Sequence, residues 1–236
     1  MDLKGKVALV TGGASDIGMS IVESLARLNC NVVINYNTSE NAANKLKEKL
    51  EGNVKVLLIK ADISNEDEVK SMIDKVIDEF GRIDILINNA AYTSDSSIYE
   101  KSKKEFMRVL EVNVWGTFSV SKYASIYMNE GIIINISSTD AVDTYNEYNI
   151  DYSLSKAAIN SLTKSLALVL PNIKVLALMP LFVNTEIVKN MDKDYLEYEL
   201  KRTNQKRLLD ASEVSDKVIE LINSDIKSGS IIRMEE

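Results

Sequence analysis

The 236-residue chain has no histidine, one cysteine and two prolines. Without histidine, the chain has no imidazole to serve as a base, a proton shuttle or a metal ligand. The single thiol of Cys30 cannot form an internal disulfide and provides no metal-binding cluster. We therefore predict no metal site, and we expect a reducing, cytoplasmic compartment.

Basic residues are also few, since 28 lysines and arginines stand against 35 acidic residues, for a net charge of -7. An acidic surface repels nucleic acids and anionic lipids, which disfavours both as partners. No apolar run approaches the roughly 18 residues of a transmembrane helix, and the first residues lack a signal-peptide pattern. We expect no membrane association.

What the chain does have is a regular alternation of apolar runs and amphipathic segments. Strands are predicted at 6–11, 31–36, 54–60, 83–88, 131–137, 173–179 and 230–234. Helices are predicted at 17–29, 39–51, 65–80, 101–128, 150–170 and 213–223. The strands are continuously apolar, as expected when both faces of a sheet are covered. This predicts an α/β fold, a doubly wound, Rossmann-type parallel sheet of about seven strands with helices on both faces.

No linker, repeat or low-complexity stretch interrupts the pattern, so we predict a single domain over 1–236. The polar segment 184–212 follows the carboxyl end of a predicted strand, where open α/β sheets bind ligands. Two interpretations of this segment stay open. It is either a lid that covers the substrate or an ordinary pair of surface helices.

A glycine-rich turn follows the first strand and opens the first helix, and it reads Thr11-Gly12-Gly13-Ala14-Ser15-Asp16-Ile17-Gly18. Glycines let the backbone approach a pyrophosphate, and a helix N-terminus offers free N–H groups and a positive dipole end. The turn predicts a dinucleotide site, although a tight turn without a ligand has the same residues.

The residues after the second strand bear on the choice of cofactor. An acid about 20 residues after the glycine turn would bind the adenosine ribose and select NAD. Here the segment is Asn35-Tyr36-Asn37-Thr38-Ser39, which contains no acid. NADP is therefore preferred, with Asn37 as a contact. NAD stays open because the segment has no lysine or arginine to hold a 2′-phosphate.

Tyr152 and Lys156 are the first candidates for catalysis. Residues four apart share one helix face, and a nearby ammonium lowers the pKa of a phenol toward the neutral range. Tyr99 and Lys103 have the same spacing but lie in a polar segment. Ser138 follows the strand at 131–137, where its hydroxyl can meet a substrate carbonyl. A turn serine and a solvated helical pair are the alternatives.

Together these motifs resemble the classical short-chain dehydrogenases over nearly the whole chain, most closely the branch that is similar to 3-oxoacyl-acyl-carrier-protein reductases. The residues that carry the resemblance are Thr11-Gly12…Gly18, Ala61-Asp62-Ile63, Asn88-Asn89-Ala90-Ala91, Asn113, Ser138, Tyr152…Lys156 and Pro180…Thr185. The resemblance implies hydride transfer between a nicotinamide dinucleotide and a small carbonyl or secondary alcohol, with a 3-oxoacyl thioester as one candidate. It also implies a homotetramer or homodimer built on 101–128 and 150–170.

The resemblance assigns a role to each motif. Tyr152 would be the general acid/base, and Lys156 would lower its pKa and hold the nicotinamide ribose. Ser138 would polarise the carbonyl, and Asn113 would hold a water in a proton relay. The implied cofactor contacts are Thr11, Gly12, Gly13, Asp16, Ile17, Gly18, Asn37, Asp62, Ile63, Asn89, Ala90, Tyr152, Lys156, Pro180, Val183 and Thr185.

The chain departs from the family pattern at Asp16, where the family has glycine. A carboxylate beside a pyrophosphate costs on the order of 1 kcal/mol or more. If Asp16 caps a helix that starts near Ile17, it points away from the phosphates, and cofactor binding is weakened rather than lost. This departure, with Leu181 in place of another family glycine, leaves a catalytically weak dinucleotide-binding regulatory protein as the alternative.

Carrier-protein docking is a separate question. Acyl carrier proteins are acidic, and the reductases that use them carry basic residues before two of the strands. Here those positions read Met128-Asn129-Glu130-Gly131 and Leu170-Pro171-Asn172-Ile173. Docking of an acidic protein is therefore disfavoured, and a small free substrate is the better prediction.

Overall fold

The computed structural model describes residues 2–234, whose strands form one parallel sheet. The strand order is β3-β2-β1-β4-β5-β6-β7, and every neighbouring pair is parallel. The strands are β1 (Val7–Thr11), β2 (Asn31–Tyr36), β3 (Val56–Lys60), β4 (Ile85–Asn88), β5 (Gly131–Ile136), β6 (Ile173–Met179) and β7 (Ile231–Arg233). This confirms the predicted fold class. Because the direction of the strand order reverses between β1 and β4, a crevice opens at the carboxyl ends of these strands.

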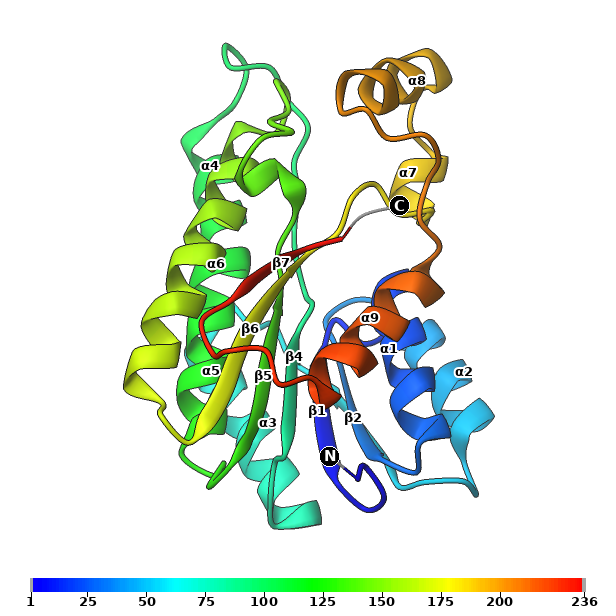
Figure 1. Ribbon diagram of the computed structural model, residues 1–236, viewed down its shortest axis with the longest axis vertical. Helices are drawn as coiled ribbons and strands as arrows, with labels where there is room; N and C mark the ends of the chain where they lie inside the picture. Colours follow the sequence, from blue (N-terminus) through cyan, green and yellow to red (C-terminus); the bar gives the residue numbers. More distant parts are fainter. Residues whose placement is uncertain (1, 235–236) are drawn as a thin grey trace.

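Helices cover both faces of the sheet (Figure 1). One face carries α1 (Asp16–Arg27), α2 (Glu40–Leu50) and α9 (Ala211–Asn223). The other carries α3 (Glu66–Phe80), α4 (Lys103–Leu110), α5 (Thr117–Ser125) and α6 (Ile150–Val169). Each face has its own apolar core, which explains why the strands are apolar on both sides.

Cys30, directly before β2, lies in the first of these cores and is fully buried. Its Sγ donates to the carbonyl of Lys6 at 3.3 Å. Burial, together with the nearby carboxylate of Asp84, raises the pKa of the thiol to about 12. The only cysteine of the chain is therefore neutral and shielded from reagents.

The prediction of one uninterrupted α-helix over 101–128 is wrong. A π-helical segment, η1 (Glu111–Gly116), separates α4 from α5. Gly116 packs against Ile63, and a Cβ on this glycine would lie 2.7 Å from the Ile63 side chain. Such a segment inserts one residue into the helix, which hydrophobic periodicity does not reveal, and π-segments of this kind are frequent at functional sites.

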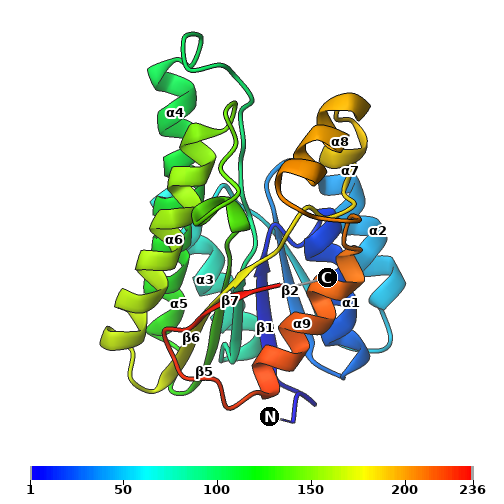
Figure 2. The ribbon, with the colours of Figure 1, turned by 45° about the horizontal axis from the view of Figure 1, so that its top comes forward.

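The segment 184–212 contains two helices, α7 (Glu186–Lys189) and α8 (Lys193–Arg202), and it stands above the carboxyl ends of the strands (Figure 2). Hydrogen bonds tie α8 to the loop 139–149, since the Tyr195 hydroxyl accepts from Asn146 Nδ2 at 2.8 Å. The Tyr195 ring also meets the ring of Tyr148 edge-on. Within residues 2–234, no helix has the length and apolar character needed to span a bilayer.

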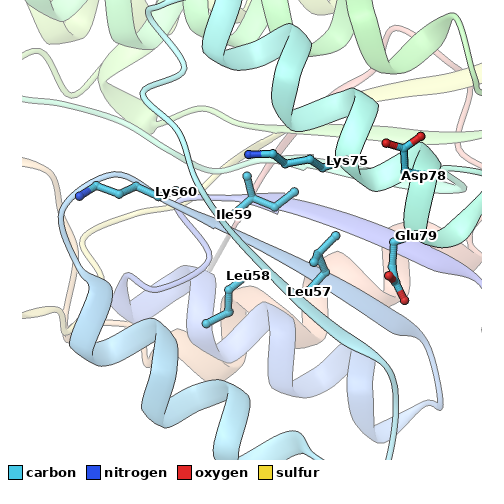
Figure 3. Close-up of a pocket in the computed structure, with 7 residues that line it drawn as sticks. All are labelled: Leu57, Leu58, Ile59, Lys60, Lys75, Asp78 and Glu79. Atoms are coloured by element: carbon cyan, nitrogen blue, oxygen red, sulfur yellow. The ribbon is translucent and has the colours of Figure 1, made fainter.

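A separate cavity of about 410 Å³ lies at the edge strand β3 (Figure 3). Its walls are the aliphatic side chains of β3 and the charged side chains of Lys75, Asp78 and Glu79 from α3. It shares no lining residue with the cleft at the carboxyl ends of the strands. The candidate chemistry of this chain therefore lies in that second cleft.

Candidate active site

A cleft of about 830 Å³ follows the carboxyl ends of the strands. This volume falls in the range of roughly 300–1,000 Å³ that ligand pockets occupy. Residues from the end of every strand from β1 to β6 reach it. Of the predicted site residues, the cleft is lined by Gly12, Asp16, Ile17, Asn37, Asp62, Ile63, Asn89, Ala90, Ser138, Tyr152, Lys156, Pro180, Val183 and Thr185.

The glycine turn is closely packed. Gly12 has a φ of 60°, and a Cβ on it would lie 2.9 Å from Ala90 Cα. A Cβ on Gly18 would lie 2.2 Å from the carbonyl oxygen of Gly12. Thr11, Gly13 and Gly18 are buried and do not line the cleft. These three residues were predicted as cofactor contacts, but they lie under the surface of the turn and contribute to its packing.

Asparagines and a threonine brace the turn. Thr11 Oγ1 accepts from the amides of Asn89 and Ala90, at 3.0 and 3.1 Å. Asn89 Nδ2 donates to the carbonyls of Thr11 and Gly12, both at 3.0 Å. From β2, Asn35 Oδ1 accepts from the Gly12 amide at 3.3 Å. Asn35 is a bracing residue that the sequence motifs did not single out, and its only signal was a polar residue inside an apolar strand.

The N-terminus of α1 leaves two donors toward the cleft. Ser15 is its N-cap, and Ser15 Oγ accepts from the amide of Gly18 at 3.3 Å. The amides of Asp16 and Ile17 have no hydrogen-bond partner among residues 2–234, and both residues line the cleft. Unpaired amides at the end of a 12-residue helix fit a pyrophosphate. The turn therefore suits a dinucleotide.

Asp16 does not cap the helix as expected. The helix begins at Asp16 itself, with Ser15 as the N-cap. The Asp16 carboxylate instead accepts from the backbone amide of Glu186 at 2.7 Å. This residue starts α7, so the carboxylate joins the glycine turn to the segment 184–212. The condition under which Asp16 would cap its own helix is therefore not met, because Ser15 already occupies the capping position.

At the adenosine end, Asp62 is committed to protein partners. Its carboxylate accepts from the amide and hydroxyl of Ser64, at 2.9 and 2.7 Å, and from Arg108 Nη2 at 2.7 Å. Burial raises the pKa of Asp62, but the hydrogen bonds from Ser64 and Arg108 outweigh it and hold the pKa below its usual value. Arg108, on α4, also lines the cleft. No motif pointed to Arg108.

Ser138, Tyr152 and Lys156 come together at the other end. Ser138 follows β5, and the other two lie on α6, with Lys156 Nζ 5.3 Å from the centre of the Tyr152 ring. Lys156 Nζ donates to the carbonyl of Ile136 at 2.8 Å. The tyrosine and the lysine thus meet, as the spacing predicts, beside the serine. Tyr99, by contrast, is almost fully exposed.

Comparison with known proteins identifies the family of this chain. Residues 6–196 match the family model described as short chain dehydrogenase. The chain belongs to the short-chain dehydrogenase family. It is 31% identical over 245 residues to a 3-oxoacyl-[acyl-carrier-protein] reductase of Thermotoga maritima, covering 100% of this chain and 98% of the relative.

Two solved structures are also similar to this dehydrogenase. One is a short chain dehydrogenase from Burkholderia cenocepacia J2315 in complex with NADP, with a TM-score of 0.93 and 28% identity over 100% of this chain and 98% of that one. The other is a NAD⁺-bound xylitol dehydrogenase, with a TM-score of 0.90 and 27% identity over 99% of each chain. The protein is an oxidoreductase that uses NAD or NADP.

The electrostatics of this dehydrogenase differ from expectation at the tyrosine. Burial lowers the pKa of Lys156 to about 8. Burial and the carboxylate of Asp140 raise the pKa of Tyr152 well above its usual value, and a hydrogen bond with Ser138 opposes them only in part. The lowering of the phenol pKa by Lys156 is not seen here, because burial and a nearby carboxylate both disfavour the phenolate.

Asn113 lies within the π-segment η1 and is buried. Its Nδ2 donates to the carbonyl of Tyr92 at 3.0 Å and to Ser155 Oγ at 2.9 Å, and its Oδ1 accepts from the Tyr92 amide at 2.7 Å. Both amide hydrogens are therefore used. The side chain ties the loop after β4 to α6, the helix that carries Tyr152.

A buried ion pair also fixes the start of α6. Lys101 Nζ lies 3.1 Å from Asp151 Oδ2, and the side chain of Asp151 is fully buried while that of Lys101 is mostly buried. Asp151 directly precedes Tyr152, so the pair anchors the tyrosine to the segment before α4. Lys101 and Asp151 carry no motif, and the sequence could suggest them only as two charges near the predicted site.

Proposed function

We propose that this chain interconverts a small carbonyl compound and a secondary alcohol by hydride exchange with NADP or NAD. The observation that carries the proposal is that Ser138, Tyr152 and Lys156 share one cleft with a glycine turn that leaves two amides unpaired. Among proton donors, a phenol in this position suits general acid/base catalysis.

Each side chain has a role in the reduction direction. Tyr152 gives its phenolic proton to the carbonyl oxygen, and Ser138 donates a hydrogen bond to the same oxygen and orients it. Lys156 holds the nicotinamide ribose and keeps positive charge near the phenol. A nicotinamide held there would supply the hydride. Asn113 anchors α6 through Ser155 and, as the resemblance implies, would hold a water of the proton relay.

The residues that would hold the cofactor extend along the cleft from Asp62 to the segment 184–212. The unpaired amides of Asp16 and Ile17 would hold the pyrophosphate. Asp62 and Ile63 would contact the adenine, and Pro180, Val183 and Thr185 the nicotinamide. We propose NADP as the preferred form because Asn37, Thr38 and Ser39 put no carboxylate beside the ribose. We propose the segment 184–212 as a lid, because Thr185, Ile187, Val188 and Met191 line the same cleft.

A small free substrate fits better than one carried on a protein. The turns 128–131 and 170–173 offer no basic side chain to an acidic carrier. A 3-oxoacyl thioester is the second candidate substrate, and the 31% identity to the Thermotoga maritima reductase supports it. The presence of Asn113, Ser138, Tyr152 and Lys156 together favours an enzyme over a regulatory protein that only binds the dinucleotide.

We also propose that the chain forms a homotetramer or homodimer through α4, α5 and α6. Trp115 and Phe118 are exposed side by side, with ring centroids 5.7 Å apart, and Leu154 on α6 is exposed as well. Light scattering coupled to size-exclusion chromatography should show an oligomer. Trp115→Glu should reduce its mass toward 26.3 kDa, whereas Tyr99→Glu, at another exposed aromatic, should leave it unchanged.

The first experiment is a fluorescence titration of the purified protein with NADPH and NADH. A cofactor that binds is then tested in a panel of ketones and keto thioesters. Tyr152→Phe should reduce kcat/KM by about 10³-fold while the cofactor still binds. Tyr99→Phe is the matched control, because Tyr99 has a lysine at the same spacing but lies outside the cleft.

The outcomes separate cleanly. Failure of both cofactors to bind at high micromolar concentration would mean that the glycine turn is disabled, and the proposal would be withdrawn. Binding together with full activity of Tyr152→Phe would leave the dinucleotide site standing and refute the role of the tyrosine.

A further inference from the structure

Asp140 is an acid in the substrate end of the cleft that no motif assigns. It lies in a short 3-10 turn, η2 (Thr139–Ala141), directly after Ser138. The backbone amide of Asp140 donates to Ser138 Oγ at 3.2 Å. Asp140, Ser138 and Tyr152 line the same cleft. The turn therefore holds the backbone of Asp140 at the hydroxyl that we propose to orient the carbonyl, and the carboxylate is near enough for its charge to act on Tyr152.

The carboxylate is held on one side only. Thr144 Oγ1 donates to Asp140 Oδ1 at 2.7 Å, and Thr144 Oγ1 lies 2.8 Å from Thr139 Oγ1. Asp140 Oδ2 has no protein partner within the described residues, and it is not among the fully buried atoms that lack one. One carboxylate oxygen is thus positioned by the protein, and the other remains open to a ligand.

Burial raises the pKa of Asp140, and the hydrogen bond from Thr144 and the charges of Arg202 and Lys156 oppose this rise only in part. Among the residues that line the cleft, the only cations are Arg108 and Lys156. Arg108 pairs with Asp62 at 2.7 Å, and Lys156 lies at the tyrosine. Behind Asp140, Arg202 of α8 pairs with the buried Glu199 at 2.6 Å. The substrate end therefore offers the carboxyl group of Asp140 as a hydrogen-bond acceptor, and neither Arg108 nor Lys156 forms an ion pair with it.

The side chains around Asp140 are also polar and not basic. Asn146 and Asn149, from the same loop, line the cleft, as do Thr93 and Asp95 from the loop after β4. None of these side chains is basic. A carboxylate or phosphate on the substrate would face Asp140 with no basic side chain from these two loops to balance its charge, which is unfavourable in a partly desolvated cleft.

We propose that Asp140 is a specificity-determining residue that accepts a hydrogen bond from a donor group of the substrate, one or two carbons from the reacting carbon. The donor is a hydroxyl or an ammonium, and substrates with a carboxylate there are rejected. This inference rests on the proposed carbonyl reduction and names its substrate class. A site built to bind a donor discriminates strongly against the analogue that lacks it.

The test compares four ketones that differ in one group. These are 2-butanone, 1-hydroxy-2-butanone, 1-amino-2-butanone and 2-oxobutanoate, each assayed with the cofactor that the titration identifies. The wild-type chain should show a kcat/KM at least about tenfold higher for one of the donor-bearing ketones than for 2-butanone. Its kcat/KM for 2-oxobutanoate should be below that for 2-butanone. The better of the hydroxyl and amino ketones tells which donor is used.

Variants then assign the preference to Asp140. Asp140→Ala should bring the ratio of donor ketone to 2-butanone down to about one. Asp140→Asn keeps a neutral acceptor, so a preference for the hydroxyl should survive in part while one for the ammonium should be lost. Asp143→Ala is the matched control, because Asp143 is exposed, lies outside the cleft and pairs with Arg233. A thermal melt of each variant reports folding.

The result that overturns the inference is equal kcat/KM for 2-butanone and both donor ketones in the wild-type chain, or an unchanged ratio in folded Asp140→Ala and Asp140→Asn. Loss of the ratio in the Asp143→Ala control would also overturn it. If the wild-type chain binds cofactor but reduces no ketone of the wider panel, the proposed function fails first, and the inference fails with it.

Discussion

The two ends of the cleft are built differently. At the cofactor end, a tight glycine turn is braced by side chains from β1, from β2 and from the residue after β4, which bond to backbone groups at 3.0 to 3.3 Å. At the substrate end, the walls are the loop 139–149 and the segment 184–212, joined by a few side-chain contacts such as Asn146 with Tyr195. A braced cofactor end combined with a substrate end made of loops lets one fold serve many substrates.

The largest effect is expected when the glycine turn at the cofactor end is disturbed. Gly18→Ala would place a Cβ 2.2 Å from the Gly12 carbonyl oxygen, which backbone atoms cannot accommodate without moving. We expect at least a tenfold weaker NADPH affinity by titration and a lower melting temperature. Gly52→Ala, in an exposed turn with a φ of 88°, strains the backbone without approaching another atom. It should lower the melting temperature and leave the affinity unchanged. Equal affinities of both variants would contradict the bracing argument.

The pH dependence sharpens the role of the two titrating groups. Reduction needs protonated Tyr152 and charged Lys156. Because burial raises the pKa of Tyr152 and lowers that of Lys156 to about 8, the lysine loses its proton first as the pH rises. We expect kcat/KM for ketone reduction to be level below pH 7 and to fall about tenfold per unit well above pH 8. A flat profile up to pH 9.5, measured with saturating cofactor, would refute this order.

Asp16 connects the cofactor end of the cleft to the substrate end, because its carboxylate accepts from the Glu186 amide. Asp16→Asn removes the negative charge beside the pyrophosphate and keeps an acceptor for the Glu186 amide, so we expect about fivefold tighter NADPH binding. Asp16→Gly removes both the charge and the link to α7. The NADPH affinity of Asp16→Gly should rise less than that of Asp16→Asn if the link to α7 helps to position the segment 184–212. If neither variant binds more tightly than the wild type, the carboxylate does not weaken the site.

The smallest effect is expected at the substrate end of the cleft. Tyr195→Phe removes the hydroxyl that accepts from Asn146 and keeps the ring packed against Tyr148. Losing one hydrogen bond of about 1 kcal/mol should raise KM for the ketone by about threefold, with the affinity for NADPH unchanged. Tyr198→Phe, on an exposed part of the same helix, is the control. A change in NADPH affinity would show that the two ends are not independent.

The same division explains what the sequence could predict. Strands 31–36 and 173–179 have the predicted bounds, because apolar runs between polar turns mark buried parallel strands. The residues gathered at the carboxyl ends of β1, β4 and β5 could be anticipated as well, since parallel strands bring their ends together.

The rest depends on tertiary contacts. The π-segment at Asn113 comes from one inserted residue and from Gly116 packing on Ile63, which no periodicity encodes. A pair of surface helices was one of the two interpretations of 184–212, but α7 and α8 are too short for their bounds to be predicted from the sequence. Asp140 is one polar residue in an irregular turn. Its only signal was an acid two positions after Ser138, and only the fold shows that it enters the cleft.

The buried thiol described above has a practical use in spectroscopy. Cys30 is fully enclosed and holds its proton up to a pKa of about 12, so thiol-reactive dyes will not attach to the folded wild-type chain. A pair of cysteines introduced at exposed positions, such as Lys193→Cys on α8 and Lys104→Cys on α4, can then be labelled without background. Single-molecule energy transfer between the two dyes would report the distance between α8 and α4 as cofactor is added.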